Sequence, residues 1–568
     1  MTNKRNVTST VTKFALWLII MFLAFWFSLP ALNLKSGDFW SFLIFGVISF
    51  VVINAFSYVK NALKGIKIQN NTVKHEGEKF SFKKLGKPFL IALLIVVAII
   101  LFSLIMNLVG AKIFNSKNYK NLINITDSSF SEDVSEIKMS QIPVVDRDTS
   151  SALGKRKLGE MSDLVSQFEI AENYTQINYK NVPTRITPLA YGDAIKWFNN
   201  RSEGIPGYIR IDMTTQEASL VRLQEGIKYS ESEYFMRNIN RYLRFKYPTK
   251  IFDNLSFEID ENGTPYWVAS TVKFRIGFWS GRDIGGAVLV NAVTGESKYY
   301  DFNDIPQWVD QVYNSEMVIS HLNYNGKYRN GFWNSIFGQR GVLATTEGYN
   351  YLAIDDDVWL YTGMTSVSGD ESNVGFVLVN LRTKETKFYS IPGAEEYSAM
   401  SSAEGQVQEK NYSATFPILL NVSDRPTYFM SLKDAAGLVK MYAFVDVQQY
   451  QIVGTGTSVA KAKEDYASKL QAENIETDET PKTEQTVISG TVENINSAVV
   501  SGNTKYYIIL QNDSNVYTVD ISVSDRLPFI KTGDKIELTA DITVKTEYDE
   551  DGIENETTSY SIKGIKLN

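Results

Sequence analysis

Histidine chemistry has a single candidate residue in the long polar part of this 568-residue chain. The two histidines are His75, in a lysine-rich loop near the N-terminus, and His321. A Ser-His-Asp site in the polar part would therefore need His321 as its base. No serine stands in a Gly-x-Ser-x-Gly elbow. We therefore expect His321 to have a surface or core role, and we predict no catalytic residue.

Carboxylates are the next candidate chemistry, and the densest group in the repeat region is Asp355, Asp356 and Asp357. A hard cation needs several oxygen ligands that converge on one point. Successive residues of a strand point to opposite faces, so at most two of these three carboxylates could converge. We expect a solvated turn and no metal site. The paired carboxylates of a glycosidase stay an open alternative, because their separation in space decides that role.

Composition excludes several further kinds of site. The chain has no cysteine, which excludes disulfides, thiol catalysis and cysteine-based metal ligation. A glycine-rich phosphate loop must stand between a strand and a helix, whereas Gly281, Gly285 and Gly286 precede a strand. We therefore predict no cofactor.

An aromatic segment over residues 326–341 has the composition of a binding surface. It contains Phe332, Trp333 and Arg340, and aromatic and arginine side chains dominate the energetics of protein interfaces. The alternative is that these aromatic rings pack into a seam between modules.

A basic run in an otherwise acidic region is the second candidate surface. It consists of Lys155, Arg156 and Lys157. These side chains could pair within the protein, or face lipid headgroups or an anionic wall polymer. The alternative is a solvated helix face.

The elements that position these groups begin with three apolar runs in the first 110 residues. They extend over residues 14–34, 39–59 and 88–110, and each approaches the ~20 residues that cross a hydrocarbon core of ~30 Å. A cleaved signal peptide is the alternative for the first run, but a second run follows at once. Tryptophans lie toward the ends of the first two runs, where indole rings prefer the membrane interface. The sequence predicts a three-span helical anchor over residues 1–110.

Loop charge sets the predicted orientation. The loop over residues 60–87 carries eight lysines, and the N-terminal tail adds three Lys or Arg residues. The loop between the first two runs has only Lys35 and Asp38 as charged residues. Positively charged loops stay in the cytoplasm. We therefore expect a cytoplasmic N-terminus and residues 111–568 outside a bacterial cell membrane.

The charge balance differs between the two parts of the chain. Residues 1–110 contain 12 Lys and Arg against 3 Asp and Glu, and the remainder contains 45 against 61. Phosphate contacts need clustered Lys and Arg, so the acidic outer part is a poor nucleic-acid binder. A large outer part without disulfides, together with frequent Lys, Asn and Ile, suits a low-GC Gram-positive bacterium.

A nine-residue pattern repeats in the outer part. Its frame is apolar-x-apolar-Asn/Asp-x-x-Thr-x-Glu, with copies at Ile209–Glu217, Val288–Glu296 and Val377–Glu385. A degenerate fourth copy, Ala443–Gln451, lacks the Thr and the Glu. Alternating apolar residues predict a half-buried strand. The Asn or Asp caps a turn by accepting from the backbone two residues on, so each copy predicts a β-hairpin.

Further strands and a helix complete each predicted unit. A preceding strand is expected at Tyr266–Ser270 and at Tyr428–Met430, and a following helix at Pro306–Val312 and at Val459–Leu470. The units over residues 171–468 are therefore tandem α+β modules.

The hairpin frame resembles that of the PepSY-like modules of bacterial envelope proteins, and Val288–Tyr300 is its strongest copy. The resemblance implies noncatalytic modules that take part in protein or peptidase regulation at the envelope. The whole chain also resembles a family of Gram-positive membrane proteins, which implies no activity.

The remaining segments complete the predicted domains. Residues 111–170 are expected to form a juxtamembrane linker and helical segment. Residues 469–485 are acidic and nearly free of large apolar side chains, which predicts a linker. Residues 486–568 carry five or six short strands between turn signals, which predicts a small β-barrel that resembles an OB-fold. It lacks the basic and aromatic face that single-stranded nucleic acid needs.

These features favour a noncatalytic, membrane-anchored protein that binds, scaffolds or regulates a protein partner in the cell envelope, with self-association through spans or modules as an open possibility. An envelope enzyme such as a wall-glycan hydrolase is an alternative, and it would need two converging carboxylates with separated pKa values. A subunit of a transport or secretion assembly is another. It would place polar side chains inside the spans, where Asn54 and Asn107 are the only deep amides.

Overall fold

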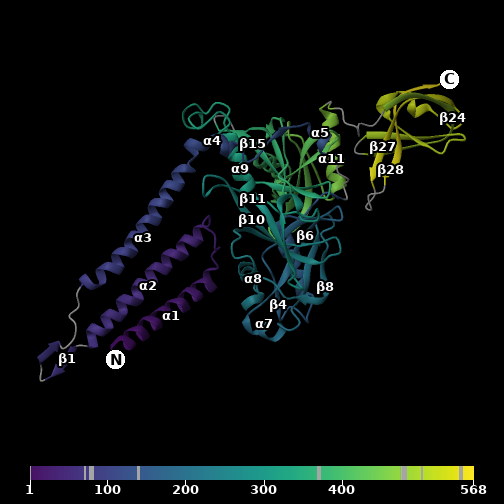
Figure 1. The fold of residues 1–568 in the computed structure, drawn as a ribbon. Coiled ribbons are helices and arrows are strands. Elements are labelled where there is room, and N and C mark those ends of the chain that lie inside the picture. The colour runs from purple at the N-terminus through teal and green to yellow at the C-terminus, as the bar shows by residue number, and fades with distance from the viewer. Residues whose placement is uncertain are drawn as a thin grey trace.

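The chain folds into a helical part, a β-rich body and a small C-terminal β domain (Figure 1). The computed structural model describes residues 2–64, 66–69, 72–75, 82–136, 141–367, 372–473, 475, 483–500, 503–548 and 554–567.

The helical part consists of α1 (Thr2–Ser28), α2 (Gly37–Lys64) and α3 (Phe82–Val109). They lie side by side, with the N-terminus at one end and the body at the other (Figure 1). In the part of the chain that the structure describes, the predicted anchor is confirmed as three helices that are long and apolar enough to cross a membrane. The qualifying stretches are Val11–Ser28, Gly37–Phe56 and Phe89–Val109.

The predicted basic loop connects α2 and α3. Its backbone forms a hairpin of β1 (Ile66–Gln69) and β2 (Thr72–His75). Residues 65, 70, 71 and 76–81 of this loop lie outside the described residues.

Over the described residues 175–367 and 372–472, the body contains four consecutive units of one kind, each an antiparallel meander of four strands followed by a helix. Neighbouring strands pair in sequence order within each unit. This architecture agrees with the predicted α+β repeat. The elements are β5 (Thr175–Tyr179), β6 (Val182–Tyr191), β7 (Ile205–Asp212), β8 (Ala218–Ile227) and α8 (Ile239–Lys246) in unit one; β9 (Phe252–Ile259), β10 (Pro265–Ile276), β11 (Ser280–Asn291), β12 (Ser297–Asp301) and α9 (Ser315–Lys327) in unit two; β14 (Asn350–Ile354), β15 (Asp357–Ser366), β16 (Ser372–Asn380), β17 (Thr386–Tyr389) and α10 (Glu396–Gln406) in unit three; and β20 (Ile418–Val422), β21 (Arg425–Lys433), β22 (Val439–Asp446), β23 (Val453–Gly456) and α11 (Val459–Ala472) in unit four.

The repeated sequence pattern is the turn between the third and fourth strands of each unit. Its Asp or Asn side chain accepts from the backbone N–H groups two and three residues on, at 2.7–3.1 Å. This local bond holds the turn independently of the rest of the fold. All four predicted hairpins are therefore confirmed, including the degenerate copy. The four accepting residues are Asp212, Asn291, Asn380 and Asp446.

The helix predictions have a mixed outcome. Helix α11 confirms the one expected from Val459, but Pro306–Val312 is not helical. In that loop the backbone N–H groups of Asp310 and Gln311 donate to the carboxylate of Glu258, at 2.8 and 3.3 Å. A long-range acceptor thus replaces the helical carbonyls. The helix α9 starts later, where the Asn314 side chain caps it.

The segment between α3 and unit one packs into the body. It contains α4 (Lys112–Lys120), α5 (Phe130–Asp133) and α6 (Arg147–Gly159), and its strand β3 (Thr126–Asp127) pairs with β17. Shorter elements extend the sheets or connect the units. They are β4 (Phe168–Ile170), α7 (Ala194–Asn200), η2 (Phe235–Arg237), η3 (Phe302–Asp304), η4 (Asn334–Gly338), β13 (Leu343–Thr345), β18 (Gly393–Ala394), η5 (Gln408–Lys410) and β19 (Ser413–Ala414).

One hydrophobic core runs through all four units. It joins large aromatic side chains that are almost fully buried, such as Tyr208, Trp267, Tyr361 and Tyr428. A second cluster joins units two and three. The units are therefore packed into one body rather than separate domains.

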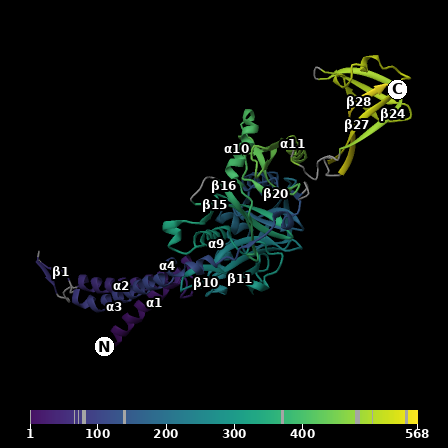
Figure 2. The same cartoon turned by 90° about the horizontal axis from the view of Figure 1, so that it is seen from above.

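The C-terminal domain contains β24 (Thr483–Val500), β25 (Asn503–Leu510), β26 (Val516–Asp520), β27 (Lys535–Tyr548) and β28 (Glu554–Leu567), with the short helices η6 (Ile521–Val523) and η7 (Leu527–Phe529). The pairing order β24-β25-β26-β28-β27 returns to β24. This domain has its own core, and it lies at the far end of the body from the helices in both views (Figures 1 and 2). Of the predicted linker 469–485, α11 occupies the first residues and β24 the last, and residues 474 and 476–482 lie outside the described residues.

The body is seated on the ends of the helices, and α8 makes the first contact. The Phe245 ring lies 5.7 Å from Trp26 of α1, and the Arg241 guanidinium lies 4.4 Å from the centre of the Trp26 ring. Nε of Arg244 donates to the carbonyl of Leu29, directly after α1, at 2.9 Å. An aromatic and arginine contact thus fixes unit one to the end of α1.

The tip of the β10–β11 hairpin makes the second contact. The Trp279 ring lies 6.2 Å from Trp40 of α2 and 5.7 Å from Phe102 of α3, and Phe278 lies 5.8 Å from Phe102. Phe102 precedes the end of α3 at Val109 by two helical turns, which is about 10 Å along the helix. The hairpin tip therefore reaches beside the apolar stretch of α3.

Candidate functional site

His321 lies on the buried face of α9. Its side chain is in the core of unit two, and Nε2 donates to the carbonyl of Arg282 at 2.8 Å. Burial lowers the pKa of His321 to about 4, so the ring is neutral at neutral pH. The structure places this histidine in the core, one of the two roles expected from the sequence.

The acidic triplet is a turn followed by an ion pair. Asp355 and Asp356 occupy the two central positions of the β14–β15 turn with φ of 50° and 68°, a conformation that Asp tolerates. Asp357 points inward and accepts from Nε and Nη2 of Arg382, both at 2.7 Å, and from the Asn380 amide at 2.8 Å. Within the described residues no group of three or more His, Asp or Glu side chains could hold a metal ion.

Three buried carboxyl groups were not foreseen from the sequence, which carries no signal of their burial. Glu258 accepts from Ser256 Oγ at 2.6 Å and from two backbone N–H groups, and Asp310 accepts from the Asn178 N–H at 2.7 Å. Burial raises the pKa of both groups, and the neighbouring Glu258 raises that of Asp310 further. Glu396, the first residue of α10 in unit three, is fully buried, and burial raises its pKa as well. Glu258 and Glu396 accept from backbone N–H groups, and Asp310 accepts from the N–H of Asn178.

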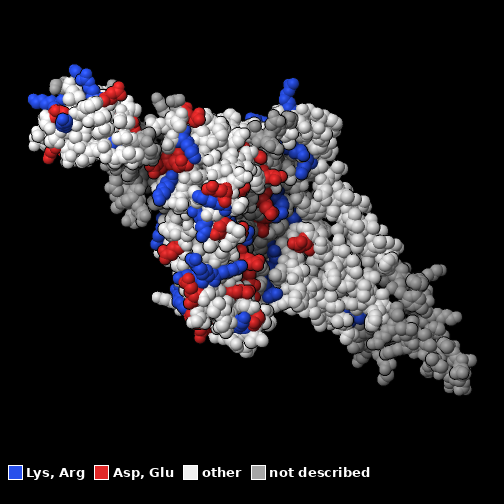
Figure 3. All heavy atoms as spheres, turned by 180° about the vertical axis from the view of Figure 1, so that it is seen from behind, with Lys and Arg blue, Asp and Glu red and all other residues white. Residues whose placement is uncertain are grey.

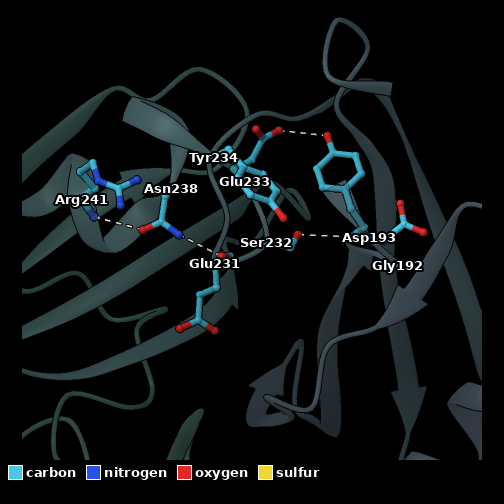
Figure 4. A pocket seen from close by; sticks show the side chains of 9 residues that line it. Gly192, Asp193, Glu231, Ser232, Glu233, Tyr234, Asn238 and Arg241 are labelled. Atoms are coloured by element: carbon cyan, nitrogen blue, oxygen red, sulfur yellow. Dashed lines mark hydrogen bonds between the residues drawn. The ribbon is translucent and has the colours of Figure 1, made fainter. Parts of the chain in front are cut away.

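A pocket of about 440 Å³ lies where the end of β6 meets the loop before α8 (Figure 4). Glu233 is its buried group. It accepts from the Tyr191 hydroxyl at 2.9 Å and from Trp197 Nε1 at 2.7 Å, and burial raises its pKa. Asp193 caps α7 by accepting from the N–H groups of Ile195 and Lys196, which lowers its pKa. The pocket therefore combines two carboxyl groups with oppositely shifted pKa values.

The geometry of this pocket does not match a glycosidase pair. In Figure 4 the carboxyl groups of Asp193, Glu231 and Glu233 point in three different directions. Both oxygens of Glu233 are already engaged with Tyr191 and Trp197. A glycosidase needs two carboxyl groups that face each other across a substrate bond. The pocket contains several acidic side chains, as the hydrolase alternative requires, but their carboxyl groups do not face one another.

The basic run lies on α6, beside an open groove of about 650 Å³ between α6 and β4. Lys155 is exposed and lines the groove, Arg156 is exposed, and Lys157 pairs with Glu160 at 3.1 Å. Phe168 and Tyr174 form part of the groove floor. The structure thus places Lys155 at a concave surface and Arg156 on the exposed face of the helix, while Lys157 is partly buried in its ion pair.

The aromatic segment forms the loop around η4. Phe332 is half-buried and stacks on Tyr328 with ring centres 6.2 Å apart. Trp333 is 61% exposed, and it stacks on Phe337, which is 79% exposed, at 5.9 Å. Arg340 is exposed, and its backbone bonds to Asn330 and Asn334. Only Phe332 takes part in an internal seam; the other two predicted residues lie at the surface.

No family model matches the chain, and no curated protein matches it. Among solved structures, the chain is similar to the mitochondrial single-stranded DNA-binding protein Rim1 from S. cerevisiae in two crystal structures, each at 20% identity over 15% of this chain and 95% of that one, with a TM-score of 0.13. It is also similar to the polysaccharide lyase Uly1 at 12% identity over 69% of this chain and 82% of that one, with a TM-score of 0.13. At these scores neither similarity carries an argument about function.

Proposed function

We propose that this protein is a noncatalytic scaffold of the bacterial cell envelope, which holds a protein-binding body at a fixed position on the membrane. The observation that carries the proposal is the seat of the body on the helix ends through Trp26, Trp40 and Phe102. A body tethered by a flexible linker samples many orientations. A seated body presents the same surface to a neighbouring membrane protein at all times, which lowers the entropy cost of binding.

The placement of the chemically active side chains supports the noncatalytic part of the proposal. His321, Glu258 and Glu396 are buried and bond to the backbone. The four-unit repeat and the ring of five strands support the PepSY-like and OB-like interpretations of the body and of the C-terminal domain. The lysine-rich loop supports a cytoplasmic N-terminus.

The test is a chemical cross-linking pull-down from native membranes with the full chain and with a variant whose seat is weakened. Phe245→Ala and Arg244→Met together remove two of the three α8 side chains that hold the end of α1, and they leave the exposed surface of the body unchanged. We expect a membrane-protein partner that the native chain captures and the variant captures several-fold less. An equal yield from both chains would contradict the seated scaffold. Glycan release from purified cell walls by the native chain would establish the hydrolase alternative instead.

The orientation is tested separately. Protease added to intact protoplasts should remove residues 111–568 while the helical part survives. Protection of the body until the cells are lysed would reverse the proposed topology.

A further inference from the structure

Two clusters of large apolar side chains are exposed on the edge of the body that meets the helices. The lower patch consists of Ile195 and Phe198 on α7 and Phe235 and Met236 on η2, which are 73, 58, 62 and 43% exposed. The upper patch consists of Trp333, Ile336 and Phe337 around η4, which are 61, 48 and 79% exposed. Clustered exposure of this kind marks an interaction surface.

The lower patch is joined to the first span by one side chain. Arg241 Nη1 donates to the carbonyl of Phe235 at 2.8 Å, and the same guanidinium lies 4.4 Å from the ring of Trp26. Trp26 stands in the last turn of the apolar stretch Val11–Ser28. A single arginine side chain therefore spans the distance between the patch and the end of that stretch.

The upper patch is joined to the third span in a comparable way. Phe332, directly before the patch, stacks on Tyr328, whose ring lies 6.4 Å from Tyr119. The Tyr119 hydroxyl donates to the carbonyl of Gly110, the residue that follows α3, at 3.0 Å. Phe114 lies nearby in the sequence at the start of α4 and is 69% exposed.

The two patches flank the helix ends. α7 and α4 lie at opposite ends of the edge where the helices meet the body (Figure 1). Between them the β10–β11 tip packs beside Phe102, about 10 Å before the end of α3 along the helix. A bilayer around the three apolar stretches would therefore reach this edge of the body on both sides of the spans.

We propose that both patches insert into the boundary between headgroups and acyl chains of the leaflet on the body's side. Aromatic and apolar side chains flanked by arginine and lysine suit this depth. Arg201 has this arrangement, with its guanidinium 3.9 Å from the exposed Phe198 ring. By contrast, charged side chains gather over the body and are sparse on the described part of the helices (Figure 3). The inference goes beyond the scaffold role, and it depends on neither the orientation nor a protein partner.

The test uses the natural absence of cysteine from the chain. The single-cysteine variants Ile195→Cys, Phe235→Cys and Phe337→Cys carry an environment-sensitive fluorophore. The full chain is reconstituted in vesicles of phosphatidylglycerol and phosphatidylethanolamine, with a spin label either near the headgroup or near the end of the acyl chain. The matched control is Phe529→Cys on the C-terminal domain, a phenylalanine that is 75% exposed.

We expect blue-shifted emission at all three patch positions, with several-fold stronger quenching by the shallow spin label than by the deep one. Position 529 should show water-like emission and no quenching by either. The inference is wrong if the patch positions behave like position 529. It is equally wrong if the emission at these positions is blue-shifted but not quenched by either spin label, and if the blue shift grows with the protein-to-lipid ratio. A second copy of the chain would then cover the patches.

Discussion

Replacing the buried carboxyl Glu396 by an amide should stabilise the body at neutral pH. The Oε1 atom of Glu396 accepts from the Gly363 N–H at 2.9 Å. Within the described residues, the buried atoms Glu396 Oε2, Thr346 Oγ1 and Asn373 Oδ1 make no hydrogen bond of ordinary geometry. The side chains of Thr346 and Asn373 nevertheless lie beside the carboxyl group, and they lower its pKa by less than burial raises it. In Glu396→Gln the amide oxygen keeps the Gly363 bond, and the new N–H₂ group can donate to Asn373.

The magnitude follows from the proton that the native carboxyl group holds. Burial raises the pKa of Glu396 above its ordinary value of 4.5. The folded state therefore binds more protons than the unfolded state, and stability falls as the pH rises above about 4.5. At about 1.4 kcal/mol for each pH unit, this cost reaches at most about 3.4 kcal/mol at pH 7. We expect Glu396→Gln to recover about 1–3 kcal/mol at pH 7 and nothing near pH 4.

The assay is the thermal unfolding midpoint of the full chain in detergent, followed by near-ultraviolet circular dichroism between pH 4 and pH 8. Each kcal/mol corresponds to about 2–4 °C for domains of 150–250 residues. Glu409→Gln, at an exposed position after α10, is the matched control and should leave the midpoint unchanged. A difference between Glu396→Gln and the native chain that stays constant with pH would refute the reasoning, as would a lower midpoint at pH 7.

Three further outcomes are expected. The pKa of His321 is lowered to about 4, so as the pH falls from about 6.5 the unfolded state binds a proton before the folded state does. The native chain should therefore lose up to about 3.4 kcal/mol of its free energy of unfolding by pH 4. His321→Gln should remove this loss from the unfolding midpoints. Arg244→Met removes a buried guanidinium that bonds to the end of α1, so amide hydrogen exchange in α8 should become about tenfold faster, while unchanged exchange would mean that the seat does not depend on this arginine. Gly295 has φ of 74°, and an added Cβ would meet the Tyr229 ring, whereas Gly331 has φ of 88° with open space around it. Gly331→Ala should therefore lower the free energy of unfolding by about 1 kcal/mol, and Gly295→Ala should lower it clearly more, as measured by thermal midpoints. Equal losses would show that the Tyr229 ring moves aside.

The repeat was predictable because its signal is local. The side chains of Asn291 and Asn380 bond to backbone only two and three residues away, so a nine-residue pattern contains the whole interaction. The degenerate copy illustrates the same point, since Asp446 keeps the turn without the Thr and the Glu. The shared core and the sheet packing depend on contacts between distant segments, which no short pattern contains.

The failed helix at Pro306–Val312 has a long-range cause. The run combines apolar and polar residues in a way that suits a helix, and its first residue, Pro306, is tolerated in a first turn. The competing acceptor is Glu258, which precedes it by some fifty residues and lies in the strand β9. The sequence shows Glu258 as one of many acids, and only the folded sheet reveals that its carboxyl group is buried at that loop.

The tryptophans show why the site was harder to predict than the fold. Trp267 is fully buried in the core, Trp279 packs among the helix ends, and Trp333 is exposed. Hydropathy and residue type are identical in the three cases, so composition alone cannot assign them. The role of an exposed tryptophan depends on its distance from the ends of the apolar helices. Contacts of α8, the β10–β11 tip and the Tyr119 hydroxyl set that distance. Under the proposed insertion, exposed aromatic rings beside those ends contact lipid, and exposed rings far from them are candidates for contact with a protein partner.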